Sequence, residues 1–304
     1  MKKHFRSNGK LLISGEYVVL DGADALAIPT KKGQSLTVEN AEKDTISWKS
    51  FKDSGELWLD FDLAFAEIKN WDIDQKPQDA RERLIQILAA AKKLNPQFLT
   101  EEKGINIKTK LEFPQFWGLG SSSTLINNIA SWAEVNAFQL LDLTFGGSGY
   151  DIACAGNDNA IFYTKVNGEP IVKETTFFPS FADELYFIHL NQKMNSREGI
   201  AYYRQQPKER LITAIEQISA IGRKMQACDT LSDFENLIVE HEMITSTLLN
   251  IQPIKERLFK DYNGAIKSLG AWGGDFILAT RHDALEYFKR HGYQTIVPFM
   301  EMKK

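Results

Sequence analysis

Cysteine is nearly absent from this sequence, and long apolar runs are absent altogether. The two cysteines, Cys154 and Cys228, have no metal-binding spacing, so they predict buried thiols in a reducing compartment. The N-terminus is basic and then apolar, but Gly15 and Glu16 interrupt the apolar residues, and no run reaches the length of about 18 that a membrane span needs. We therefore expect a cytoplasmic protein without a signal peptide or a membrane contact.

The sequence also lacks a strong charge of either sign. Its formal net charge is −4 over 304 residues, and its 43% hydrophobic and 25% charged residues are typical of a globular protein. This balance gives no general nucleic-acid footprint, although it allows a local basic pocket. The chain has no fixed-period repeat and no low-complexity linker. Its length allows two modest domains, which we place at residues 1–170 and 171–304.

Hydrophobic periodicity predicts a mixture of strands and helices, with Asn167-Gly168 as a hairpin turn. Strands are expected at residues 10–20 (broken at 14–16), 35–39, 45–51, 55–61, 105–113, 159–166 and 184–190, and in both arms of 265–280. Helices are expected at 79–94, 121–139, 150–156, 207–228 and 231–249, with a final helix and strand in 283–299. This mixture predicts an α+β fold with helices on one face of the sheet.

The stretch FWGLGSSSTL, residues 116–125, places two glycines and three serines at the start of a predicted helix. The first turn of a helix has unpaired N–H groups and a partial positive charge, and a loop without bulky side chains lets a phosphate reach them. A serine that caps the helix after a tight turn would explain the same residues. By itself, the stretch supports an anion-binding loop and a capped turn equally.

Three further stretches accompany this loop in a fixed order. GKLLISGEY (residues 9–17) precedes it, and GGSGYD (146–151) and GAWGGD (270–275) follow it. Together, the four stretches resemble the ordered motifs of the GHMP kinase superfamily, which includes galactokinase, homoserine kinase, mevalonate kinase and phosphomevalonate kinase. Asn8 stands where the family often has proline, and Trp272 replaces a small residue of its last motif. The resemblance covers essentially the whole chain.

The resemblance implies both a fold and an activity. The fold would be the GHMP kinase fold, with a ribosomal-protein-S5-like N-terminal domain and a ferredoxin-like C-terminal domain. The activity would be transfer of the γ-phosphoryl group of ATP, with Mg²⁺, to a small acidic acceptor. GEYVVL and GSGYDIA are most similar to the mevalonate-pathway kinases, so mevalonate is favoured and phosphomevalonate is the alternative. A decarboxylase of the superfamily and a non-catalytic ligand sensor are further alternatives, and the chain would act as a monomer or homodimer.

The resemblance also implies roles for individual residues. Asp151 would accept the proton of the acceptor hydroxyl, and Lys10 would keep Asp151 ionised. The alternatives are a helix N-cap for Asp151 and a solvated strand lysine for Lys10. Ser122 would help to hold Mg²⁺, whereas N-capping remains an alternative for Ser123 and Thr124. The nucleotide loop would comprise Pro114, Gly118, Leu119, Gly120, Ser121, Ser122 and Ser123.

Acceptor binding is implied for a second group of residues. This group comprises Glu16, Tyr17, Ser148, Lys193, Ser196, Arg197, Gly273 and Gly274. Lys193 and Arg197 suit a carboxylate or a phosphate, although a solvated basic loop explains them equally well. The acidic metal ligand of mevalonate kinases has no counterpart in register, because the nearest acid, Asp142, reads more simply as a surface aspartate at a helix end. His241 shares an apolar stripe and is predicted to lie at the core edge, bonded to a neighbour.

Overall fold

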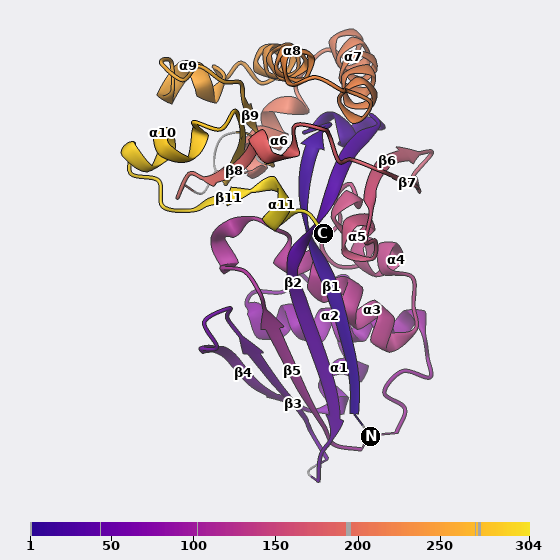
Figure 1. Cartoon of the computed structure of the whole chain (residues 1–304). Coiled ribbons are helices and arrows are strands. Elements are labelled where there is room, and N and C mark those ends of the chain that lie inside the picture. Colours follow the sequence, from indigo (N-terminus) through magenta and orange to yellow (C-terminus); the bar gives the residue numbers. More distant parts are fainter. Residues whose placement is uncertain (1, 43, 102, 193–195, 271, 273–274) are drawn as a thin grey trace. The chain divides into compact units, whose positions relative to one another are not determined.

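The computed structural model describes the chain except for residues 1, 43, 102, 193–195, 271 and 273–274. The chain forms two compact units, each assembled from separate stretches. The first comprises Met1–Gly9, Lys32–Gln115 and Leu119–Gly156, and the second comprises Lys10–Lys31, Phe116–Gly118 and Asn157–Lys304. Strands β1 (Lys2–Ser14) and β2 (Ala25–Asn40) each run from one unit into the other (Figure 1). The division of the sequence at residue 170 remains a prediction.

A mixed sheet forms the framework of the first unit. Its strands have the order β4-β3-β5-β2, and β1 also pairs with β2. β3 runs parallel to β5, whereas β3 with β4 and β2 with β5 are antiparallel. The bounds are β3 Ile46–Phe51, β4 Leu57–Leu63 and β5 Ile105–Leu111. Alternate residues of β3 and β5 are buried, as the period-2 pattern predicts.

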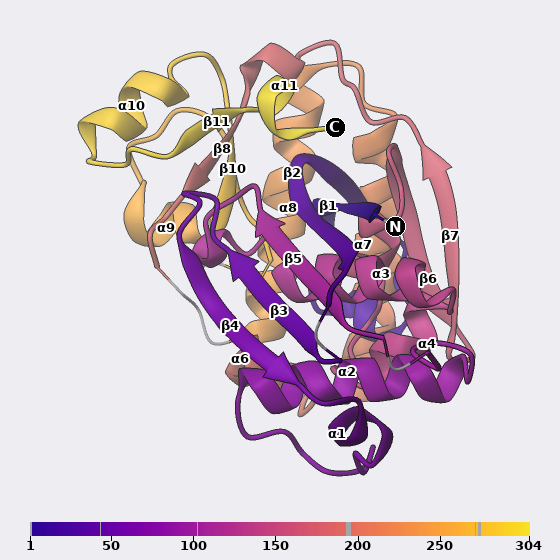
Figure 2. The same ribbon diagram turned by 90° about the horizontal axis from the view of Figure 1, so that it is seen from below.

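Helices cover one face of this sheet (Figures 1 and 2). They are α1 (Phe65–Lys69), α2 (Ala80–Leu94), α3 (Ser121–Ala133), α4 (Ala137–Asp142) and α5 (Tyr150–Ala155). One hydrophobic core joins Leu88 of α2 and Ile129 of α3 to Trp48 and Ile107 of the strands. This core places α3, the helix that follows the glycine-rich loop, on a rigid support.

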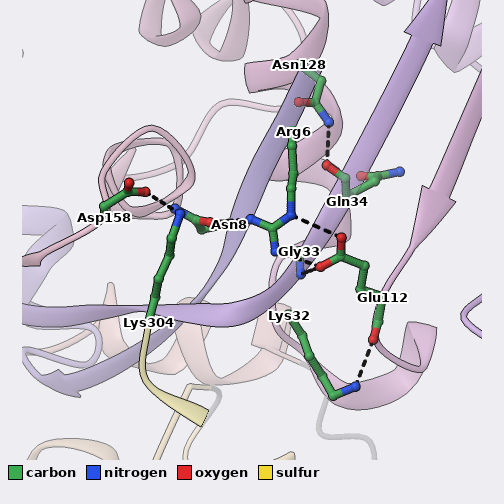
Figure 3. Close-up of polar contacts among 9 residues, drawn as sticks. All are labelled: Arg6, Asn8, Lys32, Gly33, Gln34, Glu112, Asn128, Asp158 and Lys304. Atoms are coloured by element: carbon green, nitrogen blue, oxygen red, sulfur yellow. Dashed lines mark hydrogen bonds and ion pairs between the residues drawn. The ribbon is translucent and has the colours of Figure 1, made fainter. Parts of the chain in front are cut away.

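An ion pair ties β1 and β2 to the end of β5 (Figure 3). The Arg6 guanidinium donates to both carboxylate oxygens of Glu112, at 3.0 and 2.7 Å, and to Asn8 Oδ1 at 2.8 Å. Glu112 also accepts a bond of 2.8 Å from Gly33 N–H, and Lys32 donates to its backbone carbonyl. Burial opposes ionisation of Glu112, but these bonds and the charge of Arg6 outweigh it, so its pKa is lowered. Asn8, at the family's proline position, therefore has a polar contact that proline could not make.

The second unit contains an antiparallel sheet of order β11-β8-β10-β9. The bounds are β8 Leu185–His189, β9 Ile266–Ser268, β10 Phe276–Thr280 and β11 Ile296–Pro298. A hairpin of β6 (Ala160–Val166) and β7 (Glu169–Thr175) joins the start of β2. Its turn is Asn167-Gly168, with φ values of 52° and 87°, as the sequence predicts.

Most helices of the second unit follow β7. They are η3 (Ala182–Glu184), α6 (Ser196–Tyr203), α7 (Lys208–Gln226), α8 (Leu231–Leu249), α9 (Ile254–Leu258), α10 (Ala284–Arg290) and α11 (Phe299–Met302). α7 and α8 lie side by side (Figure 1). Asp24 N–H donates to Ser219 Oγ at 3.0 Å, which fastens α7 to the segment after β1. Within the described part of the chain, no helix is long and apolar enough to cross a membrane.

Two predicted elements differ from the structure. Residues 17–20 form no strand, because the chain turns at Tyr17 into a short 3₁₀ helix, η1 (Val18–Asp21). The single helix predicted for 121–139 is two helices. α3 ends where Glu134 adopts a left-handed φ of 56°, and the Asn136 side chain caps α4 by accepting bonds from its first N–H groups. The helix therefore ends at this local cap, although the apolar stripe continues beyond it.

Candidate functional site

The glycine-rich stretch leads directly into α3, as the sequence predicts. Gly120 is the N-cap, with left-handed φ 86° and ψ 47°, and no side chain caps this end of the helix. The N-cap alternative for the serines and for Thr124 is therefore wrong. Ser121, Ser122 and Ser123 form the first turn, and the first intrahelical bond joins Thr124 N–H to the Gly120 carbonyl at 2.9 Å. The three serine N–H groups precede that bond, and the Ser122 side chain is exposed among them.

A side chain at Gly118 would collide with Asp275. Gly118 has φ 66°, and an added Cβ would lie 2.7 Å from Asp275 Cγ. Both residues belong to the second unit. The glycine is therefore required by a neighbour within the protein, and the start of the loop is coupled to the residue just before β10.

Buried polar side chains hold α3 on β1 and β2. Ser7 Oγ donates to Asn128 Oδ1 at 2.8 Å and accepts from Asn127 Nδ2 at 2.9 Å. Asn128 Nδ2 donates to the Gln34 carbonyl at 2.9 Å (Figure 3), and Thr124 Oγ1 donates to Gln34 Oε1 at 2.6 Å. Because buried amides lose free energy when unpaired, this network fixes the orientation of the helix. The sequence shows only polar residues within an otherwise apolar stripe.

The GGSGYD stretch forms a second glycine-capped helix in the first unit. Gly149 is the N-cap of α5, with φ 94°, so Asp151 is the second helical residue and the N-cap alternative for it is wrong. A carboxylate in the first turn is stabilised by the helix dipole. Ser148 and Tyr150 are buried, whereas Asp151 is partly exposed.

Lys10 lies on β1 in the second unit and is partly buried rather than fully solvated. Asp151 belongs to the first unit, so the predicted action of Lys10 on Asp151 remains a prediction. Asp142 is the exposed last residue of α4, as the reading of a surface aspartate at a helix end predicts.

The GEY turn that follows β1 has an uncommon backbone. Gly15 has φ 110°, and an added Cβ would lie 2.7 Å from Ala25 Cβ. Tyr17 has φ 63° and ψ −50°. Residues other than glycine rarely adopt this backbone conformation unless the surrounding structure enforces it. Burial, together with the charge of Glu16, raises the pKa of Tyr17 to about 12. This backbone turns Glu16 inward and packs the Tyr17 ring 6.0 Å from the Tyr203 ring.

Glu16 belongs to a buried charge cluster in the second unit. Its Oε1 lies 2.5 Å from Lys267 Nζ, and its Oε2 lies 3.2 Å from His241 Nε2. Burial opposes ionisation of Glu16, but the charge and hydrogen bond of Lys267, with His241 close by, outweigh it and hold its pKa at about 2. Burial and the charge of Lys267 lower the pKa of His241, so the imidazole is neutral near pH 7. Lys267 is therefore the cation that keeps Glu16 ionised.

Glu242, next to His241 on α8, completes this cluster. Its Oε2 accepts from Ser268 Oγ at 2.9 Å, and its Oε1 accepts from Trp272 Nε1 at 3.1 Å. Sequence reasoning singled out His241 and Trp272 but not Glu242 or Ser268. The one sequence feature that points to Glu242 is that it is an acidic residue on the buried side of a predicted helix.

Aromatic rings gather where the glycine-rich loop passes through the second unit. His189 Nε2 lies 3.2 Å from the Phe116 carbonyl oxygen, and its Nδ1 lies 3.1 Å from Asn191 Oδ1. The His189 ring lies 5.4 Å from the Phe116 ring, 6.4 Å from Trp117 and 5.0 Å from Phe276. Phe116 is nonetheless 61% exposed. A buried histidine therefore fixes the backbone of the loop while one aromatic ring faces solvent.

Five of the predicted acceptor-binding residues lie in or next to segments that the structure leaves undescribed. Lys193, Gly273 and Gly274 lie outside the described residues. Ser196 and Arg197 form the start of α6. Their predicted contacts with an acceptor therefore remain predictions.

The far end of α6 is anchored within the second unit. Tyr203 Oη donates to Asp21 Oδ2 at 2.6 Å, and Arg204 forms an ion pair of 3.0 Å with Asp21 Oδ1. Burial and the Asp21 carboxylate raise the pKa of Tyr203 well above its usual value, so it remains a donor. Asp21 ends the 3₁₀ helix that follows Tyr17, so α6 and the GEY turn share one support.

Comparison with known proteins gives matches only among solved structures, because no protein-family model and no curated protein matches the chain. Methanococcus jannaschii mevalonate kinase is 14% identical, with a TM-score of 0.68 over 96% of this chain and 94% of its own. Lactococcus lactis galactokinase, solved with galactose, is 14% identical, with a TM-score of 0.69 over 99% and 93%. Streptococcus pneumoniae phosphomevalonate kinase, solved with phosphomevalonate and AMPPNP, is 15% identical, with a TM-score of 0.65 over 95% of both chains.

At this level of identity the matches establish the fold. The chain has the α+β fold of the GHMP kinases, which confirms the predicted fold class. Mevalonate, phosphomevalonate and sugar kinases match with similar scores, so the fold by itself does not select an acceptor.

Proposed function

We propose that the chain is an ATP-dependent small-molecule kinase of the GHMP type. The observation that carries the proposal is the N-terminus of α3, where Gly120 caps the helix without a capping side chain. The N–H groups of the first turn are then available to phosphate oxygens, which the helix dipole also favours. The shared fold and the ordered motifs support the same activity.

ATP would bind with Mg²⁺ as its companion ion. Mg²⁺ keeps several waters and prefers substrate phosphates with few protein oxygens, which fits the single exposed hydroxyl of Ser122. Among the described residues, no group of three or more histidines, cysteines and acids could hold a metal alone. Bound to the phosphates, the ion would neutralise charge on the transferred group. The loop residues Pro114, Gly118, Leu119, Ser121 and Ser123 would shape the surface around them.

Asp151 would act as the general base and Lys10 as its electrostatic partner. Asp151 lies in the first turn of α5, and its carboxylate would accept the proton of the acceptor hydroxyl. A positive charge at Lys10 would favour the developing alkoxide. Glu16 has a different place in this proposal, because its two oxygens already face Lys267 and His241. It would support the GEY turn rather than touch the acceptor.

The proposed acceptor is a mevalonate-pathway acid, with mevalonate favoured and phosphomevalonate as the second candidate. The likeness of GEYVVL and GSGYDIA to those kinases supports it, and Tyr17 and Ser148 lie within these stretches. The cations Lys193 and Arg197, with Ser196, would bind a carboxylate or phosphate. Gly273 and Gly274 would lie near the acceptor through the last motif. We also propose that the enzyme works in the cytoplasm as a monomer or homodimer.

The test is ADP release over a panel of mevalonate, phosphomevalonate, galactose and homoserine, with nucleotide affinity measured by calorimetry. Gly120→Ala places a side chain at φ 86°, and Gly55→Ala places the same side chain at φ 87° in a turn where no neighbour lies within 4 Å. Because the two φ values are nearly the same, Gly55→Ala controls for the cost of a side chain at positive φ, and only Gly120→Ala should weaken ATP binding. Equal ATP affinity in both variants would remove the loop from nucleotide binding.

The same assay separates the alternatives. Release of carbon dioxide and phosphate along with ADP would indicate a decarboxylase. ATP binding without turnover on any acceptor would indicate a ligand sensor. Robust turnover of galactose with none of mevalonate would refute the proposed acceptor class.

A further inference from the structure

A groove with an apolar floor runs between α7 and α8 within the second unit. The two helices lie side by side (Figure 1), and the groove has a volume of about 570 Å³. Ala214 of α7 and Leu248 of α8 line it and are buried, so they form its floor. Met243, on one wall, is 57% exposed. The proposed kinase reaction uses none of these residues.

The exposed face of α8 extends this apolar surface. Val239, Met243 and Thr247 are spaced one helical turn apart, so they lie along one face of the helix. Val239 is 53% exposed, whereas Phe234 and Ile238 of the same helix are fully buried. The outer face of an amphipathic helix normally carries polar residues. A row of exposed apolar side chains beside an apolar groove is typical of a surface that binds a helix of another chain.

The charges of the groove indicate the kind of partner. Glu209 and Arg210, in the first turn of α7, both line the groove and are both exposed. Adjacent positions of a helix do not face each other, and within the described part of the chain neither residue forms an ion pair. An acidic or a basic peptide would be attracted by one of these charges and repelled by the other. A surface with one charge of each sign is instead complementary to itself.

We propose that this groove binds a second copy of the chain, with the α7–α8 pairs of the two copies packed face to face around a two-fold axis. Each contact then occurs twice. Met243 of each copy enters the groove of the other, and Glu209 of each copy faces Arg210 of the other. This interface does not depend on the proposed kinase activity, and it selects the homodimer from the two oligomeric states proposed above.

The size of the shared face sets the expected strength of the dimer. α7 and α8 have 19 residues each, so each is about 28 Å long, and side by side they present a face about 20 Å wide. That face covers about 560 Å² on each copy, close to the roughly 600 Å² that the smallest specific interfaces bury on each partner. We therefore expect a reversible dimer with a micromolar Kd.

Sedimentation velocity over a range of protein concentrations tests the proposal. The parent chain should change from monomer to dimer as its concentration rises through the micromolar range. Met243→Lys places a charge in the apolar groove of the other copy and should weaken the dimer by about tenfold or more. Leu285→Lys is the matched control, because it changes an apolar residue of α10 in the same unit that is 38% exposed, and its Kd should equal that of the parent. Circular dichroism checks that each variant is folded.

Exchange of charges tests whether the partner is a second copy. Arg210→Glu leaves two acids in each groove and Glu209→Arg leaves two bases, so either variant alone should dimerise about tenfold more weakly or worse. Mixed in equal amounts, the two variants should form a heterodimer of parental affinity, because the acids of one copy face the bases of the other. Lys208→Glu makes the same charge change one residue away, outside the groove lining, and should leave the dimer unchanged.

Three results would overturn the proposal. They are a parent chain that stays monomeric well above the micromolar range, a dimer that Met243→Lys leaves intact, and a mixture of the two charge variants that stays monomeric. A monomeric parent whose groove binds an apolar dye, with binding lost in Met243→Lys, would assign the groove to a small molecule instead. Kinase activity in a monomeric parent would refute this interface and leave the proposed function standing.

Discussion

Removing Lys267 should expose the cost of the buried Glu16 charge. Lys267→Met keeps most of the side-chain volume but leaves Glu16 without its cation at 2.5 Å. The pKa of Glu16 is held at about 2 instead of 4.5, which at about 1.4 kcal/mol for each pH unit corresponds to about 3 kcal/mol. Breaking a buried pair from one side typically costs about 3–5 kcal/mol. We expect the free energy of unfolding at pH 7 to fall by that amount.

The pH dependence of this loss follows from the sign of the pKa change. Because the pKa of Glu16 is lowered in the folded chain, the pair stabilises the fold fully above pH 4.5, and its contribution disappears as the pH falls toward 2. The difference between parent and Lys267→Met in urea unfolding should therefore shrink below pH 4.5.

A control and a second variant make the result decisive. Lys255→Met removes a bond of 2.8 Å to the Gly264 carbonyl in the same unit, so its effect should be about 1 kcal/mol and independent of pH. Adding Glu16→Gln to Lys267→Met should recover much of the loss, because no unpaired charge remains buried. A loss in Lys267→Met that is equally large at pH 3 and pH 7, or that Glu16→Gln deepens, would refute the reasoning.

Three other perturbations have defined outcomes. Asp151→Asn keeps the shape of α5 but cannot accept a proton, so single-turnover phosphoryl transfer to a hydroxyl should slow by about 10²–10⁴-fold with ATP affinity unchanged; transfer at the parent rate would return Asp151 to a structural role. Glu242→Gln should abolish a pH effect on unfolding, because a pKa raised from 4.5 to about 7 makes the parent lose stability as the pH rises through that interval; an unchanged slope would contradict the assignment. Gly33→Ala places its Cβ against the Ser7 carbonyl oxygen and should cost about 3 kcal/mol in chemical denaturation, whereas Gly156→Ala, with its nearest neighbour at 3.6 Å, should cost much less.

The elements predicted from local patterns are those whose stabilisation is also local. Residues 231–249 are predicted as a helix and form one with those bounds, and Asn167-Gly168 is the turn it is predicted to be, since both depend on neighbours in the chain. The strand predicted for residues 17–20 is wrong, because an apolar run is buried equally well in a turn. Tertiary contacts around Gly15 and Ala25 then decide the backbone.

The motifs of the candidate site were predictable because they too depend on residues that are neighbours in the chain. Each is a short stretch in which a glycine must adopt a left-handed backbone, as Gly120 and Gly149 do. The sequence by itself therefore determined where the glycine-rich stretches lie, their order, and that α3 and α5 follow two of them, because a glycine cap and the helix after it are neighbours in the chain.

Only the tertiary structure decided which side chains support those loops. Glu16 and Lys267 are 251 residues apart in the chain, and Glu242 on α8 accepts a hydrogen bond from Trp272, which lies on a turn 30 residues later. The same sequence pattern allows Glu16 to face an acceptor or Lys267, and Trp272 to block its turn or to be held within it. Burial favours the inward contact in both cases, because a charge or an indole N–H in a dry interior loses free energy without a partner, and only the folded chain brings that partner within reach.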